Sequence, residues 1–359
     1  MKLLLLPGDG IGPEIAAGVE RVLEALSRRH QLDIDLVRRP VGLEALAADG
    51  VTVSEATFAE AAGADGVILG PVSTADYPPP AEGGLNPSAE FRRRFDLYAN
   101  IRPSRTRSGV PALASSMDLV IVRENTEGFY ADRTMHQGSG EFMPTPDLAL
   151  AIRKITRQGS ERIGRAAAGL AAGRRRKLTI VTKSNVLKMS DGLFRNAVQS
   201  AARDEADVEI EEVLVDAMAS LLVREPERFD VIVTSNMFGD ILSNEAAELA
   251  GGLGVAGSLN AGDACAIAQA AHGSAPDLAG RGQANPSALV LSTAMLIGWL
   301  AQRDGDEGAM AAAHALERAV DSALGAPGGR TVDLGGSAST AEAAEAIARA
   351  LDAAPVGVA

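Results

Sequence analysis

The chain has 359 residues, of which 46% are hydrophobic and 23% are charged, a balance typical of a folded globular protein and not of a disordered or fibrous one. Its 34 basic and 47 acidic residues give a net charge of −13, which argues against non-specific nucleic-acid binding because such binding needs a basic surface. The length suffices for one large domain or two ordinary ones. Cys265 is the single cysteine, which excludes an intrachain disulfide and a thiolate metal site.

The N-terminal segment reads MKLLLLPGDG, and its apolar run stops after Leu6 at Pro7. This run is too short for a signal peptide or a membrane span, and no other stretch approaches the roughly 18 apolar residues that a span needs. We therefore predict a buried strand entering a turn, in a soluble cytoplasmic protein.

Predicted strands and helices then alternate along the chain. Short apolar runs predict strands over residues 3–6, 34–37, 66–69, 118–122, 178–182, 208–215 and 231–234. Apolar residues at helical spacing predict helices over residues 13–26, 147–171, 190–203, 238–250 and much of the Ala-rich tail at 286–351. Ser54 has the character of a helix N-cap. This alternation predicts an α/β sheet with helices on its faces.

Two segments interrupt the alternation. Residues 70–90 form a long loop rich in proline and glycine, and such a loop in a compact domain is usually functional. Residues 128–146 contain scattered glycine, proline and aromatic residues, from which we predict an exposed hairpin or arm.

Several motifs could carry chemistry, although each is weak alone. The stretch LPGDGIGPE has the wrong spacing for a GxGxxG nucleotide loop and fits a tight strand-to-helix turn. Asp240 and Asn244 would share one helix face, which suits a hard divalent cation but also an ordinary solvated face. Arg92, Arg102 and Arg123 adjoin loops or prolines and could bind an anion, or could be ordinary surface arginines.

The motifs taken in order resemble one family. They are LPGDGIGPE, LYANIRP, RENTEG…Y, TKSNVLK, NMFGDILSNE, HGSAPD…GxxANP and TVDLGGSAST. This ordered set resembles the isocitrate/isopropylmalate dehydrogenase family, the metal-dependent β-decarboxylating dehydrogenases. The resemblance extends from about residue 3 to about residue 351, nearly the whole chain.

The resemblance implies the family's two-domain α/β/α fold, which is not a Rossmann fold. A large domain would comprise residues 1–98 and 250–359, on the cofactor side. A small domain, 99–249, would carry the dimer interface and the arm. The active site would lie in the cleft between them, and a homodimer would share its sites between subunits.

The resemblance also implies a reaction: a 3-substituted malate is oxidised at its 2-hydroxyl by hydride transfer to a nicotinamide, and the product loses its β-carboxylate. Arg92, Arg102 and Arg123 match the family's substrate-binding arginines. Tyr130 matches the general acid. Lys183 matches the base that removes the hydroxyl proton, and it is expected from the partner subunit.

The metal and the cofactor follow from the same resemblance. A Mg²⁺ or Mn²⁺ ion would be held by Asp216 of the partner subunit, by Asp240 and by Asn244. The residues expected to contact the cofactor are His272, Gly273, Ser274, Ala275, Asp277, Leu278 and Asn285. A carboxylate at position 277 accepts hydrogen bonds from a ribose diol and repels a 2′-phosphate, so we predict NAD instead of NADP.

Three residues depart from the family pattern. Asn244 stands where a third acidic metal ligand is usual, Gln269 where a glutamate usually precedes the histidine, and Ala217 where an asparagine is usual. Lost site residues mark the family's non-catalytic regulatory subunits, so such a subunit remains an alternative.

The 3-substituent of the substrate would be recognised by the helix before Arg92. Asn86 and Ser88 place neutral hydrogen-bonding groups there, whereas isopropylmalate enzymes present a glutamate and two leucines. An apolar substituent would leave these groups unpaired, at a cost of roughly 1–3 kcal/mol each if buried. We therefore predict an isocitrate- or homoisocitrate-like substrate, with 3-isopropylmalate second and tartrate or D-malate third.

Overall fold

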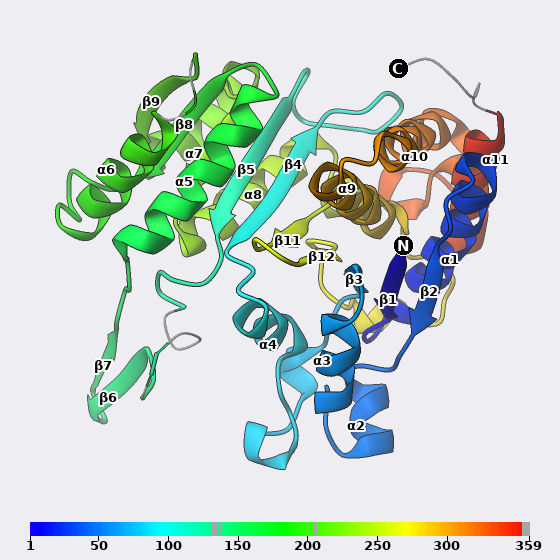
Figure 1. Cartoon of the computed structure of the whole chain (residues 1–359), viewed down its shortest axis with the longest axis horizontal. Coiled ribbons are helices and arrows are strands. Elements are labelled where there is room, and N and C mark those ends of the chain that lie inside the picture. Colours follow the sequence, from blue (N-terminus) through cyan, green and yellow to red (C-terminus); the bar gives the residue numbers. More distant parts are fainter. Residues whose placement is uncertain (131–134, 137, 204, 206, 354–359) are drawn as a thin grey trace.

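A computed structural model describes residues 1–130, 135–136, 138–203, 205 and 207–353 (Figure 1). Among these residues one mixed sheet has ten strands in the order β2-β1-β3-β12-β11-β4-β5-β10-β8-β9, and β6 pairs with β7 separately. The strands are β1 (Lys2–Leu6), β2 (Asp35–Arg38), β3 (Gly66–Leu69), β4 (Ala99–Arg105), β5 (Asp118–Glu124), β6 (Glu141–Thr145), β7 (Leu148–Ala151), β8 (Lys177–Thr182), β9 (Glu209–Leu214), β10 (Val231–Thr234), β11 (Leu259–Ala261) and β12 (Ala266–Gln269).

Helices flank the sheet, as the sequence predicts for an α/β fold (Figure 1). They are α1 (Gly12–His30), α2 (Leu43–Asp49), α3 (Glu55–Ala62), α4 (Pro87–Arg94), α5 (Arg157–Ala172), α6 (Ser190–Ala202), α7 (Val215–Arg224), α8 (Asn236–Ala250), α9 (Ser287–Asp304), α10 (Glu307–Gly325) and α11 (Thr340–Ala353). Within the described residues, every helix is too short or too polar to traverse a lipid bilayer.

Strand β5 shows how the layers form. Val120 and Val122 pack into the hydrophobic cluster that α5 and α6 share, whereas Leu119 and Ile121 pack into the cluster of α7 and α8. Because successive residues of a strand project to opposite faces, both faces of β5 are covered and the strand is apolar throughout its middle. The two faces of this half of the sheet are therefore distinct environments, one under α5 and one under α8.

The direction of the strands determines where polar groups gather. Strands β5, β10, β8 and β9 run parallel, so their carboxyl ends meet at one edge. Strands β4 and β11 run antiparallel to their neighbours and join this group to the parallel strands β12, β3, β1 and β2. Ligands of open α/β sheets bind beyond the carboxyl ends of the strands.

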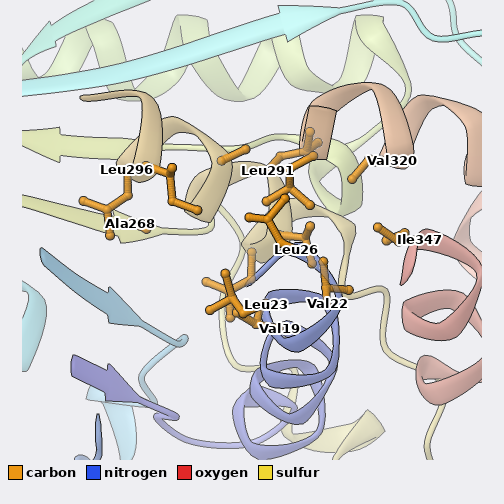
Figure 2. Close-up of a cluster of buried hydrophobic side chains, with 14 of the residues drawn as sticks. Val19, Val22, Leu23, Leu26, Ala268, Leu291, Leu296, Val320 and Ile347 are labelled. Carbon is orange, nitrogen blue, oxygen red and sulfur yellow. The ribbon is translucent and has the colours of Figure 1, made fainter. Parts of the chain in front are cut away.

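A second large core lies around α1. Val19, Val22, Leu23 and Leu26 recur at helical spacing and are at most 3% exposed. Figure 2 shows them facing side chains of α9, α10 and α11, with Leu291 among them. The predicted amphipathic helix is therefore confirmed.

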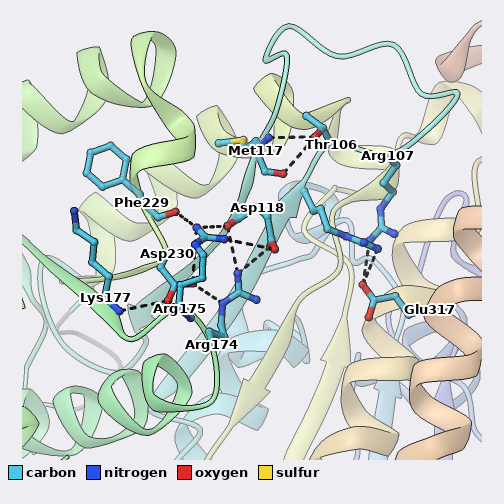
Figure 3. Close-up of polar contacts among 11 residues, drawn as sticks. Thr106, Arg107, Met117, Asp118, Arg174, Arg175, Lys177, Phe229, Asp230 and Glu317 are labelled. Carbon is cyan, nitrogen blue, oxygen red and sulfur yellow. Dashed lines mark hydrogen bonds and ion pairs between the residues drawn. The ribbon is translucent and has the colours of Figure 1, made fainter. Parts of the chain in front are cut away.

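The amino edge of the parallel strands is tied together by charged groups (Figure 3). Arg174, which precedes β8, donates to Asp118 at the start of β5 and to Asp230 just before β10, both at 2.8 Å. Asp230 is only 1% exposed. These contacts fix the edge opposite to the carboxyl ends of the same strands.

Several predicted elements are confirmed. The strands at 66–69 and 231–234 have the predicted bounds, and Ser54 caps α3 by accepting from the amide of Thr57. The α/β fold class is confirmed as well, while the two domain boundaries stay predictions. The loop at 70–90 ends early because α4 begins at Pro87.

One helix prediction is wrong. The segment 147–171 begins not with a helix but with strand β7, and α5 starts only at Arg157. Pairing with β6 across the turn Pro146–Asp147 overrides the helix propensity of the alanine and leucine residues of β7. The hairpin expected within 128–146 is present, but it spans residues 141–151. Residues 131–134 and 137 of the predicted arm lie outside the described residues. Strands β4, β11 and β12 were not predicted.

Candidate active site

The site begins with two buried arginines on neighbouring strands. In the antiparallel register of β4 and β5, Asn100 lies opposite Arg123, and Arg102 follows two residues later on β4. Opposed residues project to the same face, as do alternate residues of one strand. All three side chains therefore point to the face that α8 covers, where Arg102 is 8% and Arg123 is 3% exposed.

Helix α8 supplies the oxygen atoms that receive these guanidinium groups. Oδ1 of Asp240 accepts hydrogen bonds from Nη1 of Arg102 at 3.3 Å and from Nη1 of Arg123. Oδ1 of Asn236 accepts from Nε and Nη2 of Arg123 at 3.0 and 2.7 Å, and Oδ1 of Asn244 accepts from Nη1 of Arg102 at 3.3 Å. Residues four apart in a helix share a face, so the three acceptors form one stripe.

Two small residues of α8 allow this contact. Ser243 accepts from Nη1 of Arg102 at 2.8 Å. At Gly239 a Cβ atom would lie 2.7 Å from both Cβ and Cγ of Arg123, so only glycine permits this approach. Sequence reasoning missed three residues of this cluster. Asn100 lies two strand residues before Arg102, Asn236 one helical turn before Asp240, and Gly239 immediately before Asp240.

Both buried guanidinium groups pair with one acidic side chain of α8. Among the described residues, Arg102 and Arg123 each contact the carboxylate of Asp240. Burial lowers the pKa of Arg102, and the charge and hydrogen bond of Asp240 oppose this effect. An arginine stays protonated even so, so the cluster favours an anionic ligand such as a carboxylate.

A continuous hydrogen-bonded chain joins this cluster to α4. Arg102 donates from Nε to Oδ1 of Asn100 at 2.6 Å, and Nδ2 of Asn100 donates to Oγ of Ser258 at 2.8 Å. The backbone amide of Gln269 donates to the carbonyl of Ser258 at 3.1 Å. The side-chain amide of Gln269 then donates to Oγ of Ser88 at 2.6 Å. Ser88 is therefore connected to the arginine cluster through β12 and β4.

Helix α4 presents the remaining residues expected to bind substrate. Asn86 is its N-cap, and Oδ1 of Asn86 accepts from the amide of Ala89 at 3.1 Å. Arg92 follows Ser88 by four residues and so shares its face of the helix. The structure thus places Asn86, Ser88 and Arg92 on one short helix whose N-terminal turn adjoins Gln269.

Tyr130 lies beside the buried arginines. The centre of its ring is 5.9 Å from Cζ of Arg123, and the side chain is half-buried. This position beside a predicted carboxylate-binding group suits a proton donor.

Lys183 and Asp216 form a second cluster. Nζ of Lys183 lies 2.6 Å from Oδ1 of Asp216, and this hydrogen bond is the main cause that lowers the pKa of Asp216. The backbone amide of Lys183 donates to the buried Asp191 at 2.7 Å, and Asp191 pairs with the buried Arg153 at 2.6 Å. The two residues follow β8 and β9, and the structure pairs them with each other and not with Asp240.

Two oxygen atoms of α8 are candidates for holding a divalent cation. Oδ1 of Asp240 and Oδ1 of Asn244 both lie 3.3 Å from one nitrogen of Arg102, so both oxygen atoms face the same point of the site. Oxygen atoms of this kind suit Mg²⁺ or Mn²⁺. Among the described residues, no group of three or more His, Cys, Asp or Glu side chains could hold a metal ion within one chain. The donor set fits a hard cation that needs a further ligand from elsewhere.

A cavity of 440 Å³ adjoins the glycine-rich turn after β1. Its lining includes His272, Gly273, Ala275, Leu278 and Asn285. Nε2 of His272 is buried and has no hydrogen-bond partner among the described residues, and burial lowers the pKa of this imidazole. A neutral imidazole with an unused nitrogen fits a polar heterocyclic ring such as adenine.

The neighbouring contacts define the edge of this cavity. The carbonyl of Ser274 accepts from the amide of Ile11 at 2.8 Å, which places the loop 272–278 against the glycine-rich turn. Asp277 is exposed, in a 3₁₀ turn whose next residue, Leu278, lines the cavity. Asp333 receives a hydrogen bond from Asn285 at 3.0 Å and was missed, although it lies in the quoted TVDLGGSAST motif.

The fold and this site define a class: an α/β protein in which a buried arginine pair and a nucleotide-sized cavity flank one sheet, an arrangement that suits dehydrogenases of small carboxylic acids. The chain belongs to the isocitrate/isopropylmalate dehydrogenase family, whose sequence profile matches residues 2–347.

Individual proteins agree with this assignment. The chain is 42% identical over 351 residues to the isocitrate/homoisocitrate dehydrogenase of Thermus thermophilus, with 98% of each chain covered. It is 39% identical to the 3-isopropylmalate dehydrogenase of Saccharolobus solfataricus, covering 94% of this chain and 95% of that one. The crystal structure of isocitrate dehydrogenase from Methylococcus capsulatus superposes with a TM-score of 0.86 at 36% identity, covering 98% of this chain and 99% of that one.

Proposed function

We propose that this protein is an NAD-dependent and divalent-metal-dependent dehydrogenase that oxidises and decarboxylates a 3-substituted malate, with an isocitrate- or homoisocitrate-like substrate. The observation that carries the proposal is the buried pair Arg102 and Arg123, which lie side by side and both contact Asp240. Two guanidinium groups fixed on one face of β4 and β5 are pre-oriented to receive the carboxylates of a malate.

The remaining groups divide the proton chemistry. Arg92, Arg102 and Arg123 bind and orient the carboxylates. The partner subunit's Lys183 accepts the proton of the 2-hydroxyl, and Tyr130, beside Arg123, donates a proton to the carbon that loses the β-carboxylate. Asp240, Asn244 and Asp216 of the partner subunit would hold a Mg²⁺ or Mn²⁺ ion, which would supply positive charge next to the substrate oxygens.

NAD would be the hydride acceptor in this proposal. His272 and Asn285 would contact its adenosine part in the 440 Å³ cavity, whose wall also includes Gly273, Ala275 and Leu278. Ser274 would hold this loop in place through its bond to Ile11. The exposed Asp277 receives the ribose diol, and its negative charge disfavours the 2′-phosphate of NADP.

The substrate class rests on α4. Asn86 and Ser88 present polar groups near the arginine cluster, and a carboxylate substituent can pair with them whereas an isopropyl group cannot. The name of the Thermus relative, isocitrate/homoisocitrate dehydrogenase, supports this choice. The second candidate is 3-isopropylmalate, which the similarity to the Saccharolobus enzyme favours.

A homodimer with shared sites completes the proposal. Val186, Met189, Val223 and Ile241 are between 59% and 90% exposed, and they lie on the segments that carry Lys183, Asp216 and Asp240. Exposed apolar groups gathered around functional residues mark an interface. The hairpin β6–β7 stands away from the sheet in Figure 1, and two strands alone are marginally stable in water, so a second copy is the occupant that we propose for it.

The test is the reduction of NAD⁺ and of NADP⁺ with Mg²⁺ or Mn²⁺, followed by nicotinamide absorbance, on isocitrate, homoisocitrate, 3-isopropylmalate, tartrate and D-malate. Turnover of a tricarboxylate with NAD⁺ would support the proposal, and Lys183→Ala or Tyr130→Phe should then lower kcat by a factor of at least about 100. Turnover of 3-isopropylmalate alone would contradict the substrate class. No turnover from a folded dimer would favour a regulatory subunit.

A further inference from the structure

We infer that Arg153 is a positioning residue: through Asp191 it holds the backbone of Lys183 in place, and so it determines where the catalytic lysine lies. The inference rests on the proposed function, in which Lys183 of one subunit completes the active site of the other. It gives a role in the reaction to a residue outside every set expected to bind substrate, metal or cofactor.

The backbone around Arg153 is fixed on both sides. Arg153 follows the arm strand β7 by two residues. The amide of Ile152, before it, donates to the carbonyl of Gly140 at 2.7 Å. The amide and the carbonyl of Lys154, after it, bond to the backbone of Gly128 at 2.9 and 2.8 Å. The side chain of Arg153 therefore starts from a fixed point at the base of the arm.

The guanidinium group of Arg153 bridges two helices. Its Nη2 atom lies 2.6 Å from Oδ1 of Asp191 in α6, in a pair whose side chains are 8% and 1% exposed. Nη1 donates to Oγ of Ser190 at 2.9 Å. Nη2 also donates to Oγ of Ser235, the residue before α8, at 3.0 Å. The charged partner lies in α6 and the contact towards α8 is with a neutral hydroxyl group, so the stronger interaction is with α6.

Asp191 passes this constraint to Lys183. Oδ2 of Asp191 accepts from the backbone amide of Lys183 at 2.7 Å, while Oδ1 pairs with Arg153. The buried carboxylate cannot rotate without giving up one of these two donors. The carbonyl of Lys183 accepts from the amides of Val186 and Leu187 at 3.0 and 2.8 Å, so the same bond also holds the turn after β8.

A lysine at position 153 perturbs this arrangement with the least damage. It keeps the positive charge that the buried Asp191 needs, but a single ammonium group cannot reproduce the planar fork that contacts three side chains. Asp191 would then be free to shift, and Lys183 with it. Displacement of a catalytic group by about an ångström can cost about 100-fold in rate.

The expected kinetic signature is therefore a change in kcat without a matching change in KM. Arg153→Lys should lower kcat by roughly 10- to 100-fold and change the KM of the substrate by less than about threefold, because arginines of β4, β5 and α4 bind its carboxylates. The matched control is Arg157→Lys, whose arginine is 65% exposed and lies 3.9 Å from Glu161. The control should keep kcat within about twofold of wild type.

The experiment uses hybrid dimers, because Lys183 and Tyr130 of one active site come from different subunits in the proposed function. A Tyr130→Phe chain and a Lys183→Ala chain are co-expressed with different affinity tags, and the hybrid is purified over both. It contains one complete site, with the lysine from the first chain and the tyrosine from the second. Arg153→Lys in the first chain should lower kcat by the same roughly 10- to 100-fold, and in the second chain by less than about threefold.

The dependence on the chain separates positioning from damage. Equal losses in both hybrids would show a general structural role, and a loss only in the chain that supplies Tyr130 would show that Arg153 acts through Ser235 and α8. Either result would overturn the inference. If Arg153→Lys does not fold, Arg153→Met combined with Asp191→Asn removes both buried charges together and should show the same dependence on the chain.

The outcomes also distinguish this inference from the proposed function. If the wild type is inactive, or if the hybrid without a change at Arg153 is no more active than its two parents, the shared catalytic site is refuted and this inference with it. If that hybrid is active and Arg153→Lys leaves its kcat unchanged in either chain, only the role of Arg153 is refuted.

Discussion

The close approach of α8 to Arg123 predicts a large effect of a small substitution, Gly239→Ala. The added Cβ would lie 2.7 Å from Cβ and Cγ of Arg123 and 3.2 Å from its Cα atom, distances at which one of the two elements must move. Overpacking of this kind costs about 1–3 kcal/mol of unfolding free energy, against a gain of about 1 kcal/mol from the helix propensity of alanine. We expect a net loss of up to about 2 kcal/mol of unfolding free energy. Because Arg123 would also be displaced by up to about an ångström, kcat/KM should fall by up to roughly 100-fold.

Denaturant unfolding and steady-state kinetics check both parts. The matched control is Gly169→Ala in α5, an exposed helical glycine whose Cβ would meet only Oε1 of Glu205 at 4.0 Å. The control should gain up to about 1 kcal/mol and keep wild-type kcat/KM. The reasoning would be refuted by a Gly239→Ala protein that is as stable as the control variant and retains kcat/KM within about threefold of wild type.

Three further predictions follow from other contacts. Asp191→Asn removes the acidic partner of Arg153 from a pair whose side chains are 1% and 8% exposed, so the unfolding free energy should fall by about 3–5 kcal/mol. Asp96→Asn breaks a pair in which the aspartate is 68% exposed, so it should cost at most about 1 kcal/mol. Similar shifts of the denaturant midpoint in the two variants would contradict this. Burial lowers the pKa of His272 below its ordinary value of 6.5, so the unfolded chain binds a proton at this imidazole more readily than the folded chain does. The unfolding free energy of the wild type should therefore fall more steeply than that of His272→Gln as pH falls below 6.5. Parallel pH profiles of the two proteins would refute this prediction. Asp277→Asn should raise the ratio of kcat/KM for NADP⁺ to that for NAD⁺ by at least about tenfold, and an unchanged ratio would show that this carboxylate does not face the ribose.

The sequence predicted best the elements whose burial is local and uniform. The runs Gly66–Leu69 and Val231–Thr234 are buried on both faces, and a short apolar run bounded by turn residues is recognisable without knowing its neighbours. The segment Leu148–Ala151 was misassigned because its alanine and leucine residues favour a helix, and only pairing with β6 makes it a strand. Strand β4 was missed because its core-facing residues include Asn100 and Arg102, which are buried through polar contacts that no hydrophobic pattern reveals.

The residues of the candidate site were also predicted unevenly from the sequence. Arg102, Arg123, Asp240 and Asn244 were expected together from ordered motifs, and the structure brings them into contact. The contact between Gln269 and Ser88 joins residues 181 positions apart, and neither helix nor strand periodicity carries information over that separation. Gln269 was noted only as a departure from the family pattern, and its partner became visible only when β12 and α4 were placed side by side.

The buried arginines also help to specify the fold that holds them. Strand β5 is apolar on both faces, so its hydrophobic residues do not determine which face turns towards α8. A slip of one residue against β4 would turn Arg123 to the other face, into the cluster of apolar residues under α5. There the guanidinium would lose Asp240 and Asn236, and a buried charge without such partners costs several kcal/mol. The residues that we propose to bind the substrate therefore fix the strand register on which their own convergence depends.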